Sequence, residues 1–220
     1  MKTVAAIYTA FSIIEPTKAL FAEIVPGHRL VSIYDDSLIP DVVAAGNTMT
    51  DDVRRRFLAY CRAAEDMGAD LILSTCSSLG DIVGQAQPFI KIPLLRIDEA
   101  IARQAVDRAD SIAVLATADT PLGPTRRLLG SVAGQIGKKI TIVEGLAKGA
   151  QQALNAGQPE VHDEILLNAA LAVAGKAEVI ILAQVSMIRM QEEIAKATGK
   201  PVLSSLRPGL IALRNVLEEK

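Results

Sequence analysis

Short runs of apolar residues alternate along the chain with longer segments in which apolar positions recur every three or four residues. The short runs predict buried strands, and the longer segments predict helices. The expected strands are residues 4–8, 30–34, 71–74, 92–97, 112–116, 140–143, 179–182 and 201–203. Strands that alternate with helices are typical of an α/β fold with parallel sheets and right-handed crossovers.

The helices predicted between these strands have recognisable ends. They are residues 17–24, 51–67, a segment after Ser77, 98–108, a segment opened by Pro124, 161–174 and 210–217. We expect Pro16 to open the first helix and Gly68 to follow the last turn of the second. The polar segment 35–48 is predicted to be a loop. Cys61 lies on the apolar stripe of helix 51–67 and is therefore interpreted as a packing residue.

The second half of the sequence repeats the first at a constant offset of 108 residues. The matched positions are Thr9 with Thr117, Ser12 with Thr120, Pro16 with Pro124, Cys76 with Gln184, Ser78 with Ser186 and Pro93 with Pro201. The segment at Asp70 matches the one at Glu178 only loosely. A fixed register over this length indicates duplication, and two copies are too few for a solenoid. The simplest arrangement is two similar half-domains that face each other across a cleft. Strands 71–74 and 179–182 would then end on opposite sides of it.

Composition excludes several classes of function. The 220 residues are 50% hydrophobic and 3% aromatic, and the net charge of −2 gives no field that would attract nucleic acid or an anionic membrane. The basic run Arg54–Arg56 is balanced by Asp51 and Asp52 and is interpreted as a solvated helix face. No apolar run is long enough to span a membrane, and the N-terminus is better explained as the first core strand than as a signal peptide.

The cysteines and histidines indicate neither a disulfide framework nor a metal site. There are two of each, far apart in the sequence and without paired ligand spacing. The chain also lacks a glycine-rich dinucleotide motif and a phosphate-binding loop. We therefore expect a cytoplasmic protein without a metal or cofactor.

The stretch LILSTCSSLGD, residues 71–81, is the strongest candidate for chemistry. Cys76 would lie at the carboxyl end of a parallel strand, where open α/β sheets bind ligands. Ser77 and Ser78 would open the next helix and offer hydroxyl and N–H groups to an anion. The same helix end is expected to lower the pKa of the thiol. The alternative is that Cys76 is only a small buried hydrophobe.

These segments together resemble the aspartate/glutamate/hydantoin racemase superfamily over nearly the whole chain. The resemblance rests on LILSTCSS, on IAVLAT after Ser111, on VIILAQVSM and on the duplicated layout. It implies cofactor-free chemistry at a carbon α to a carboxylate, with one cysteine from each half acting as acid and base. It also implies two half-domains with four-stranded sheets, residues 1–97 with 206–220 and residues 98–205, and a homodimer or higher homo-oligomer.

The resemblance assigns roles by position. Cys76 matches the first-half cysteine, and Ser77 and Ser78 match residues that hold the substrate carboxylate. Hydroxyl residues expected to contact substrate are Thr9, Ser12, Thr117, Thr120 and Ser186. Capping and turn formation are the alternative interpretation of these hydroxyls.

The departure from the family pattern is Gln184, which stands where the second cysteine belongs. An amide does not titrate, so Gln184 can orient or polarise a substrate but cannot exchange its proton. Racemisation then needs another group, and Asp119 is the best-placed carboxylate, although it also fits a turn. His162 and His28 are interpreted as capping or surface residues and a turn residue, respectively.

A single thiol leaves three functions open. The first is a racemase-like isomerase that uses Cys76, the second a one-sided decarboxylase or lyase, and the third a small-molecule binding protein that has lost catalysis. The sequence does not identify the small carboxylate. Arg96, Arg189 and Arg207 are candidates to bind a second carboxylate.

Overall fold

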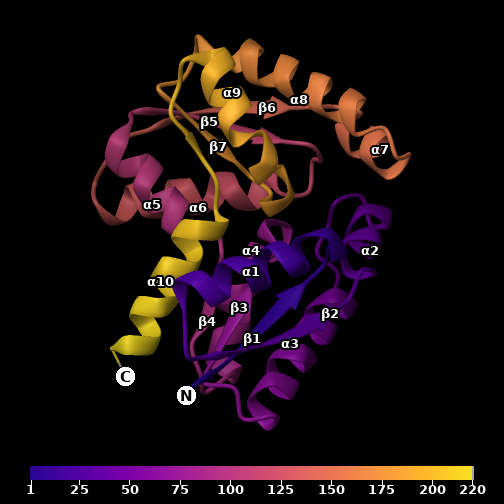
Figure 1. Ribbon diagram of the computed structural model, residues 1–220, viewed down its shortest axis with the longest axis vertical. Coiled ribbons are helices and arrows are strands. Elements are labelled where there is room, and N and C mark those ends of the chain that lie inside the picture. Colours follow the sequence, from indigo (N-terminus) through magenta and orange to yellow (C-terminus); the bar gives the residue numbers. More distant parts are fainter. Residues whose placement is uncertain (220) are drawn as a thin grey trace. The chain divides into compact units, whose positions relative to one another are not determined.

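The computed structural model describes residues 1–219, which divide into two compact units (Figure 1). The first unit comprises residues 1–99 together with the segment that begins at Leu206, and the second comprises residues 100–205. Each unit contains one four-stranded sheet in which all strands are parallel. The predicted α/β fold with two similar parallel sheets is therefore confirmed.

The first sheet has the strand order β2-β1-β3-β4. Its strands are β1 (Thr3–Tyr8), β2 (Arg29–Tyr34), β3 (Leu71–Ser74) and β4 (Leu94–Arg96). The α-helices of this unit are α1 (Ile14–Ile24), α2 (Leu38–Ala44), α3 (Asp51–Asp66), α4 (Gly80–Ala86) and α10 (Leu206–Glu218). Short 3₁₀ helices are η1 (Phe11–Ile13), η2 (Ser77–Leu79) and η3 (Gln87–Phe89). Helix α10 packs beside α1, and Arg207 pairs with Glu23 at 2.9 Å.

The second sheet has the corresponding order β6-β5-β7-β8. Its strands are β5 (Ser111–Ala116), β6 (Thr141–Leu146), β7 (Val179–Leu182) and β8 (Val202–Leu203). The helices are α5 (Glu99–Arg108), α6 (Leu122–Gln135), α7 (Ala150–Asn155), α8 (Pro159–Ala174) and α9 (Gln191–Thr198), with the 3₁₀ helix η4 (Val185–Met190) after β7. Helix α5 begins at the last residue of the first unit.

The offset of 108 residues recurs in the strand register. Val4 pairs with Leu71 in the first sheet, and Ile112 pairs with Val179 in the second. Both residue numbers of the second pair are 108 higher than those of the first. The loosely matched pair from the sequence also corresponds. Asp70 Oδ2 accepts a hydrogen bond from Thr3 N at 2.7 Å, and Glu178 Oε2 accepts one from Ser111 N at 3.1 Å. Carboxylates of different length therefore cap the start of the first strand in both units.

Both faces of each sheet are buried. In the second unit, Ile112, Val114 and Ala116 pack toward α5 and α6, whereas Ala113 and Leu115 pack toward α8 and α9. In the first unit, alternate β1 residues pack toward α2, α3 and α4, and that core contains Cys61, which is fully buried. The packing role predicted for Cys61 is confirmed.

Proline lies in the first turn of four helices, and the two helices predicted to open at Pro16 and Pro124 begin two residues before the proline. Pro16, Pro40, Pro124 and Pro208 each occupy the third helical position, in α1, α2, α6 and α10. The N–H groups of the first turn have no partner within a helix, so proline costs no hydrogen bond there. Pro40 belongs to α2, which lies inside the segment predicted as a loop. That prediction was wrong because Leu38 and Val42, four residues apart, bury one face of a two-turn helix.

None of the helices within residues 1–219 is both long enough and apolar enough to cross a membrane.

Candidate active site

Cys76 follows β3 at the carboxyl edge of the first sheet. The preceding residue, Thr75, ties this strand end to β1, since its N–H and its hydroxyl both donate to the carbonyl of Ile7, at 3.1 and 2.8 Å. Cys76 has an extended backbone with φ −111° and ψ 111°, and its carbonyl accepts a hydrogen bond from Leu79 N at 3.1 Å, which closes η2. The strand end and the 3₁₀ turn together fix the Cys76 backbone.

The thiol of Cys76 is half-buried and surrounded by donors. Burial raises the pKa of the thiol above its ordinary value. Hydrogen bonds to the sulfur offset only part of that rise; they come from the side chains of Thr9 and Ser78 and from the N–H groups of Ser78 and Leu79. The expected lowering of this pKa was wrong in its net direction. The start of the helix does stabilise a thiolate, but desolvation is the larger effect, so the thiol is protonated at neutral pH.

The hydroxyl residues of the first unit differ in their surroundings. Thr9 and Ser78 contact the Cys76 sulfur, whereas Ser12 lies on η1 and is exposed. Ser77 is 5% exposed, and within residues 1–219 its hydroxyl makes no hydrogen bond. A buried hydroxyl without a partner costs free energy.

Gln184 occupies the matching place after β7 in the second unit. Its backbone is extended with φ −125° and ψ 139°, and its carbonyl accepts from Met187 N at 3.2 Å, as Cys76 does from Leu79. Its side-chain Oε1 accepts hydrogen bonds from Thr117 N at 2.8 Å and from Thr117 Oγ1 at 3.0 Å. Thr9 meets Cys76 and Thr117 meets Gln184, so each unit contains the same contact with different chemistry.

The other residues predicted in the second unit lie near this strand end but make different contacts. Asp119 is exposed, and its carbonyl accepts from Leu122 N at 3.1 Å in the turn before α6. Thr120 is buried in the same turn, and Ser186 is half-buried in η4. Sequence analysis missed Gln151 of α7, whose Oε1 lies 3.2 Å from Thr117 Oγ1. Gly149, which lies just before α7 and adopts a positive φ, is the residue in the sequence that could have indicated the turn there.

A buried ion pair supports the Cys76 loop. Arg96 on β4 pairs with Ser74 on β3. Its side chain donates to Asp98 through Nε at 2.9 Å and through Nη2 at 2.8 Å. The side chains of Arg96 and Asp98 are 13% and 4% exposed. A Cβ added to Gly80 would lie 2.2 Å from Arg96 Nη2, so only glycine leaves room for the guanidinium here. Gly80 and Asp98 were not identified from the sequence, although Gly80 lies within the stretch 71–81, because their contact with Arg96 depends on the fold.

The three arginines considered for a second carboxylate are all paired within the protein. Arg96 binds Asp98, Arg207 binds Glu23, and Arg189 binds Asp163. His162 is 3% exposed, with Nδ1 2.7 Å from Asp163 Oδ1 and 3.1 Å from Arg189 Nη2. The interpretation of His162 as a capping or surface residue was therefore wrong, because its side chain is enclosed by α8 and η4.

The basic run of α3 is solvated only in part. Arg55 pairs with Asp52 at 2.7 Å on an exposed face. Arg56 is 25% exposed and turns inward to Asp35, Ser37 and Asp41. The first two arginines fit the predicted solvated face, and Arg56 departs from it because the α2 segment covers that side of α3.

Within residues 1–219, His, Cys, Asp and Glu side chains form no group of three or more that could hold a metal ion.

Comparison with known proteins relates the whole chain to one family. The profile of the Asp/Glu/Hydantoin racemase family matches residues 9–210. A search of curated protein sequences gave no match.

Solved structures share the fold at low sequence identity. Glutamate racemase RacE1 from Bacillus anthracis superposes with a TM-score of 0.82 at 12% identity, covering 99% of this chain and 82% of that one. Allantoin racemase from Klebsiella pneumoniae gives 0.70 at 14% identity, covering 100% and 89%. A glycine-to-cysteine mutant of arylmalonate decarboxylase in its sulfate-associated form gives 0.60 at 15% identity, covering 99% and 93%.

Proposed function

The chain belongs to the Asp/Glu/Hydantoin racemase family, and we propose that it is a cofactor-independent isomerase acting at a carbon α to a carboxylate through Cys76. One observation supports this assignment above others. Cys76 and Gln184 occupy the same backbone position after β3 and β7, each beside a threonine, and only one of the two side chains titrates.

The proposed step begins with the thiolate of Cys76, which is the minor form at neutral pH because the thiol pKa is raised. The thiolate removes the proton from the α-carbon, and the C–H electron pair moves into the carboxylate to give an enediolate. Return of a proton from the thiol to the same face restores the substrate with its hydrogen exchanged, whereas protonation of the opposite face by a second acid, proposed to be Asp119, gives inversion. Donors around the sulfur, from Thr9, Ser78 and the Leu79 N–H, hold the thiolate, and Ser77 supplies a free hydroxyl for the substrate carboxylate.

Gln184 is proposed to bind the substrate without exchanging its proton. Because Thr117 already occupies Oε1, the Nε2 group is left to donate to a substrate oxygen. Thr120, Ser186 and Ser12 are proposed as further substrate contacts. Asp119 is proposed as a second acid or base when inversion requires one.

A decarboxylase is the second candidate, and the raised pKa of Cys76 favours it. A thiol that is protonated at neutral pH is ready to protonate an enediolate after loss of carbon dioxide. Both candidates take a small carboxylate. We further propose a cytoplasmic protein, because both cysteines are free thiols, and a homodimer or higher homo-oligomer, as the family resemblance implies.

The test is solvent exchange at the α-carbon. Candidate 2-amino, 2-hydroxy and 2-aryl carboxylates are incubated with the protein in deuterated water, and mass spectrometry measures deuterium at that carbon. We expect incorporation with the native protein and with Cys61→Ala, and none with Cys76→Ala. Release of carbon dioxide from a 2-substituted malonate, with deuterium in the product, would identify the decarboxylase. Binding of these acids without exchange or release would identify a binding protein and contradict the proposal.

A further inference from the structure

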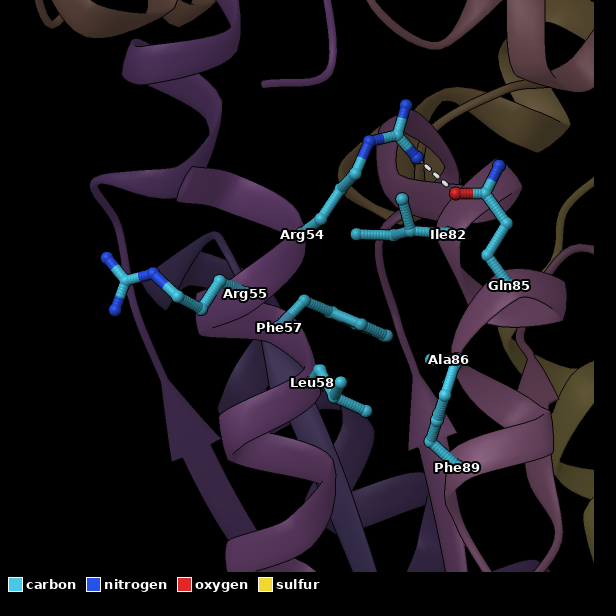
Figure 2. Close-up of a pocket in the computed structure, with 8 residues that line it drawn as sticks. All are labelled: Arg54, Arg55, Phe57, Leu58, Ile82, Gln85, Ala86 and Phe89. Atoms are coloured by element: carbon cyan, nitrogen blue, oxygen red, sulfur yellow. Dashed lines mark hydrogen bonds between the residues drawn. The ribbon is translucent and has the colours of Figure 1, made fainter. Parts of the chain in front are cut away.

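An apolar groove of about 300 Å³ runs between α3 and α4 in the first unit (Figure 2). Phe57 and Leu58 of α3 form one wall, and Ile82 and Ala86 of α4 with Phe89 of η3 form the other. Phe57 and Ile82 are buried beneath it, whereas Phe89 is 63% exposed at its edge. The volume is at the lower end of the range of about 300–1,000 Å³ that holds small ligands.

One end of this groove is closed by a polar bridge. Arg54 Nη1 donates to Gln85 Oε1, and Figure 2 shows both side chains above Ile82. The bond occupies one lone pair of Gln85 Oε1, and arginine has no acceptor. The guanidinium and the Gln85 amide nitrogen therefore present mainly donors, together with one positive charge. Such a pair of donors suits a carboxylate.

The positive charge at the bridge is only weakly neutralised. Arg54 Nε lies 3.9 Å from Asp51, whose side chain is fully exposed. The neighbouring Arg55 also lines the groove, but its guanidinium pairs with Asp52 at 2.7 Å. The groove thus has an apolar floor and one cationic end.

We propose that this groove binds a small amphipathic monocarboxylate, with the apolar body between α3 and α4 and the carboxylate on Arg54 and Gln85. Helix α4 follows the Cys76 turn without a break, since η2 ends at Leu79 and α4 begins at Gly80. A ligand wedged against Ile82 and Ala86 therefore bears on the helix that holds Cys76. The site is an effector site separate from the thiol, and its occupancy does not depend on the proposed reaction.

Binding of 3-phenylpropanoate, measured by titration in NMR spectra, tests the proposal. Arg54→Gln should weaken binding at least about tenfold, as expected for losing a hydrogen bond to a charged group. Arg55→Gln is the matched control and should stay within about twofold. The neutral 3-phenylpropanamide should bind at least about tenfold more weakly than the acid. Cys76→Ala should leave binding unchanged, which separates this site from the thiol.

The effector role has its own measurement, the rate of Cys76 alkylation by iodoacetamide. Saturating 3-phenylpropanoate should change this rate at least about twofold in the native protein and not in Arg54→Gln. Equal affinity in Arg54→Gln and Arg55→Gln, or absence of binding, would overturn the proposal. So would a dimer in sedimentation that dissociates in Phe89→Ser, because a second copy of the chain would then cover the groove. An unchanged alkylation rate at saturation would overturn the effector role.

Discussion

In the first unit β3 leads into Thr75, Cys76, Ser77 and Ser78, whereas in the second β7 leads into Ala183, Gln184, Val185 and Ser186. The backbones of these turns correspond in register and in their 3₁₀ hydrogen bond. Three polar groups of the first turn, a thiol and two hydroxyls, are replaced by an amide and two aliphatic side chains. Both turns keep the same frame, because Thr75 N donates to the Ile7 carbonyl and Ala183 N donates to the Leu115 carbonyl, although Ala183 lacks the hydroxyl that adds a second bond at Thr75.

The residues behind the turns also exchange size. Gly80 in the first unit leaves room for Arg96, and the corresponding pair in the second unit is Ile188 with Ser204. Ser204 donates to Gln191 Oε1 at 2.6 Å rather than to an acid. The large side chain of the pair is therefore Arg96 on β4 in the first unit and Ile188 on η4 in the second. Each unit fills the corresponding space with a different pair of residues.

Cys76→Ala against Gln184→Ala should give the largest difference between the units. Loss of a proton-transfer group lowers kcat by about 10²–10⁴-fold, whereas loss of one neutral hydrogen bond costs about tenfold or less. Steady-state kinetics on the substrate found by solvent exchange measures both, with Cys61→Ala as the cysteine control. Equal losses in the two variants would contradict the unequal roles. Gln184→Cys should add inversion at the α-carbon, detected by chiral chromatography.

Gly80→Ala should destabilise the first unit by about 1–3 kcal/mol, because the new methyl group displaces Arg96 and leaves the buried Asp98 without its partner. Gly84→Ala on the same helix is the matched control. A Cβ there meets no atom within 4 Å, so helix propensity should stabilise the variant by about 0.5–1 kcal/mol. Urea unfolding measures both, and a Gly80→Ala protein as stable as Gly84→Ala would show that Arg96 moves without cost.

The pH dependence of kcat/KM tests which form of Cys76 reacts. Its pKa is raised, so a reaction that needs the thiolate should accelerate about tenfold per pH unit up to that pKa. A reaction that needs the thiol as an acid should be constant below that pKa and fall above it. Gln184 adds no further ionisation to the pH–rate profile, because an amide does not titrate. Gln184→Cys should add a further ionisation, and a profile that is unchanged by this substitution would argue against a shared substrate.

The variants Asp35→Asn and Asp163→Asn test how much one carboxylate stabilises the packing of α3 in the first unit and of α8 in the second. Asp35 accepts hydrogen bonds from Ser37, from Tyr60 at 2.6 Å and from Arg56, and we expect its loss to cost about 1–2 kcal/mol. Asp163 accepts from the more exposed Arg189 and lies 2.7 Å from the His162 ring, so its loss should cost about 1 kcal/mol, less than the loss of Asp35.

Acid should remove the difference between these two carboxylates. Burial alone would raise the pKa of Asp35 and Asp163, but their hydrogen bonds and ion pairs lower it in the folded protein. Each carboxylate therefore contributes stability above its unfolded pKa of about 4, and loses it as the pH falls through the folded value. Thermal unfolding over a pH series from 7 downward checks this, and a difference that does not shrink as the pH falls below the unfolded pKa would contradict it.

Periodicity predicted the strands well because buried parallel strands are apolar throughout. Residues 71–74 and 179–182 match β3 and β7 at both ends. It failed at α2 and at α7, whose seven and six residues are too few to show a helical period. The helix starts predicted at Pro16 and Pro124 were two residues too late, since proline is tolerated at several positions of a first helical turn.

The candidate site was predictable only where sequence order fixes it. Strand ends and the offset of 108 residues located Cys76, Gln184, Thr9 and Thr117. The net pKa of Cys76 was not predictable, because it depends on how closely the fold surrounds the sulfur. The same holds for Arg96, whose carboxylate partner is only two residues away but is buried by the rest of the unit.

Both ends of the described chain lie in the first unit, where Lys2 Nζ donates to the carbonyl of Leu217 at 2.5 Å. Genetic rearrangement can therefore act on the order of the units without cutting either sheet. A circular permutant that links these ends and opens between residues 99 and 100 would encode the second unit first, followed by the first unit as one uninterrupted segment. In that order each unit would be one continuous segment of the chain, and the two repeats would follow one another.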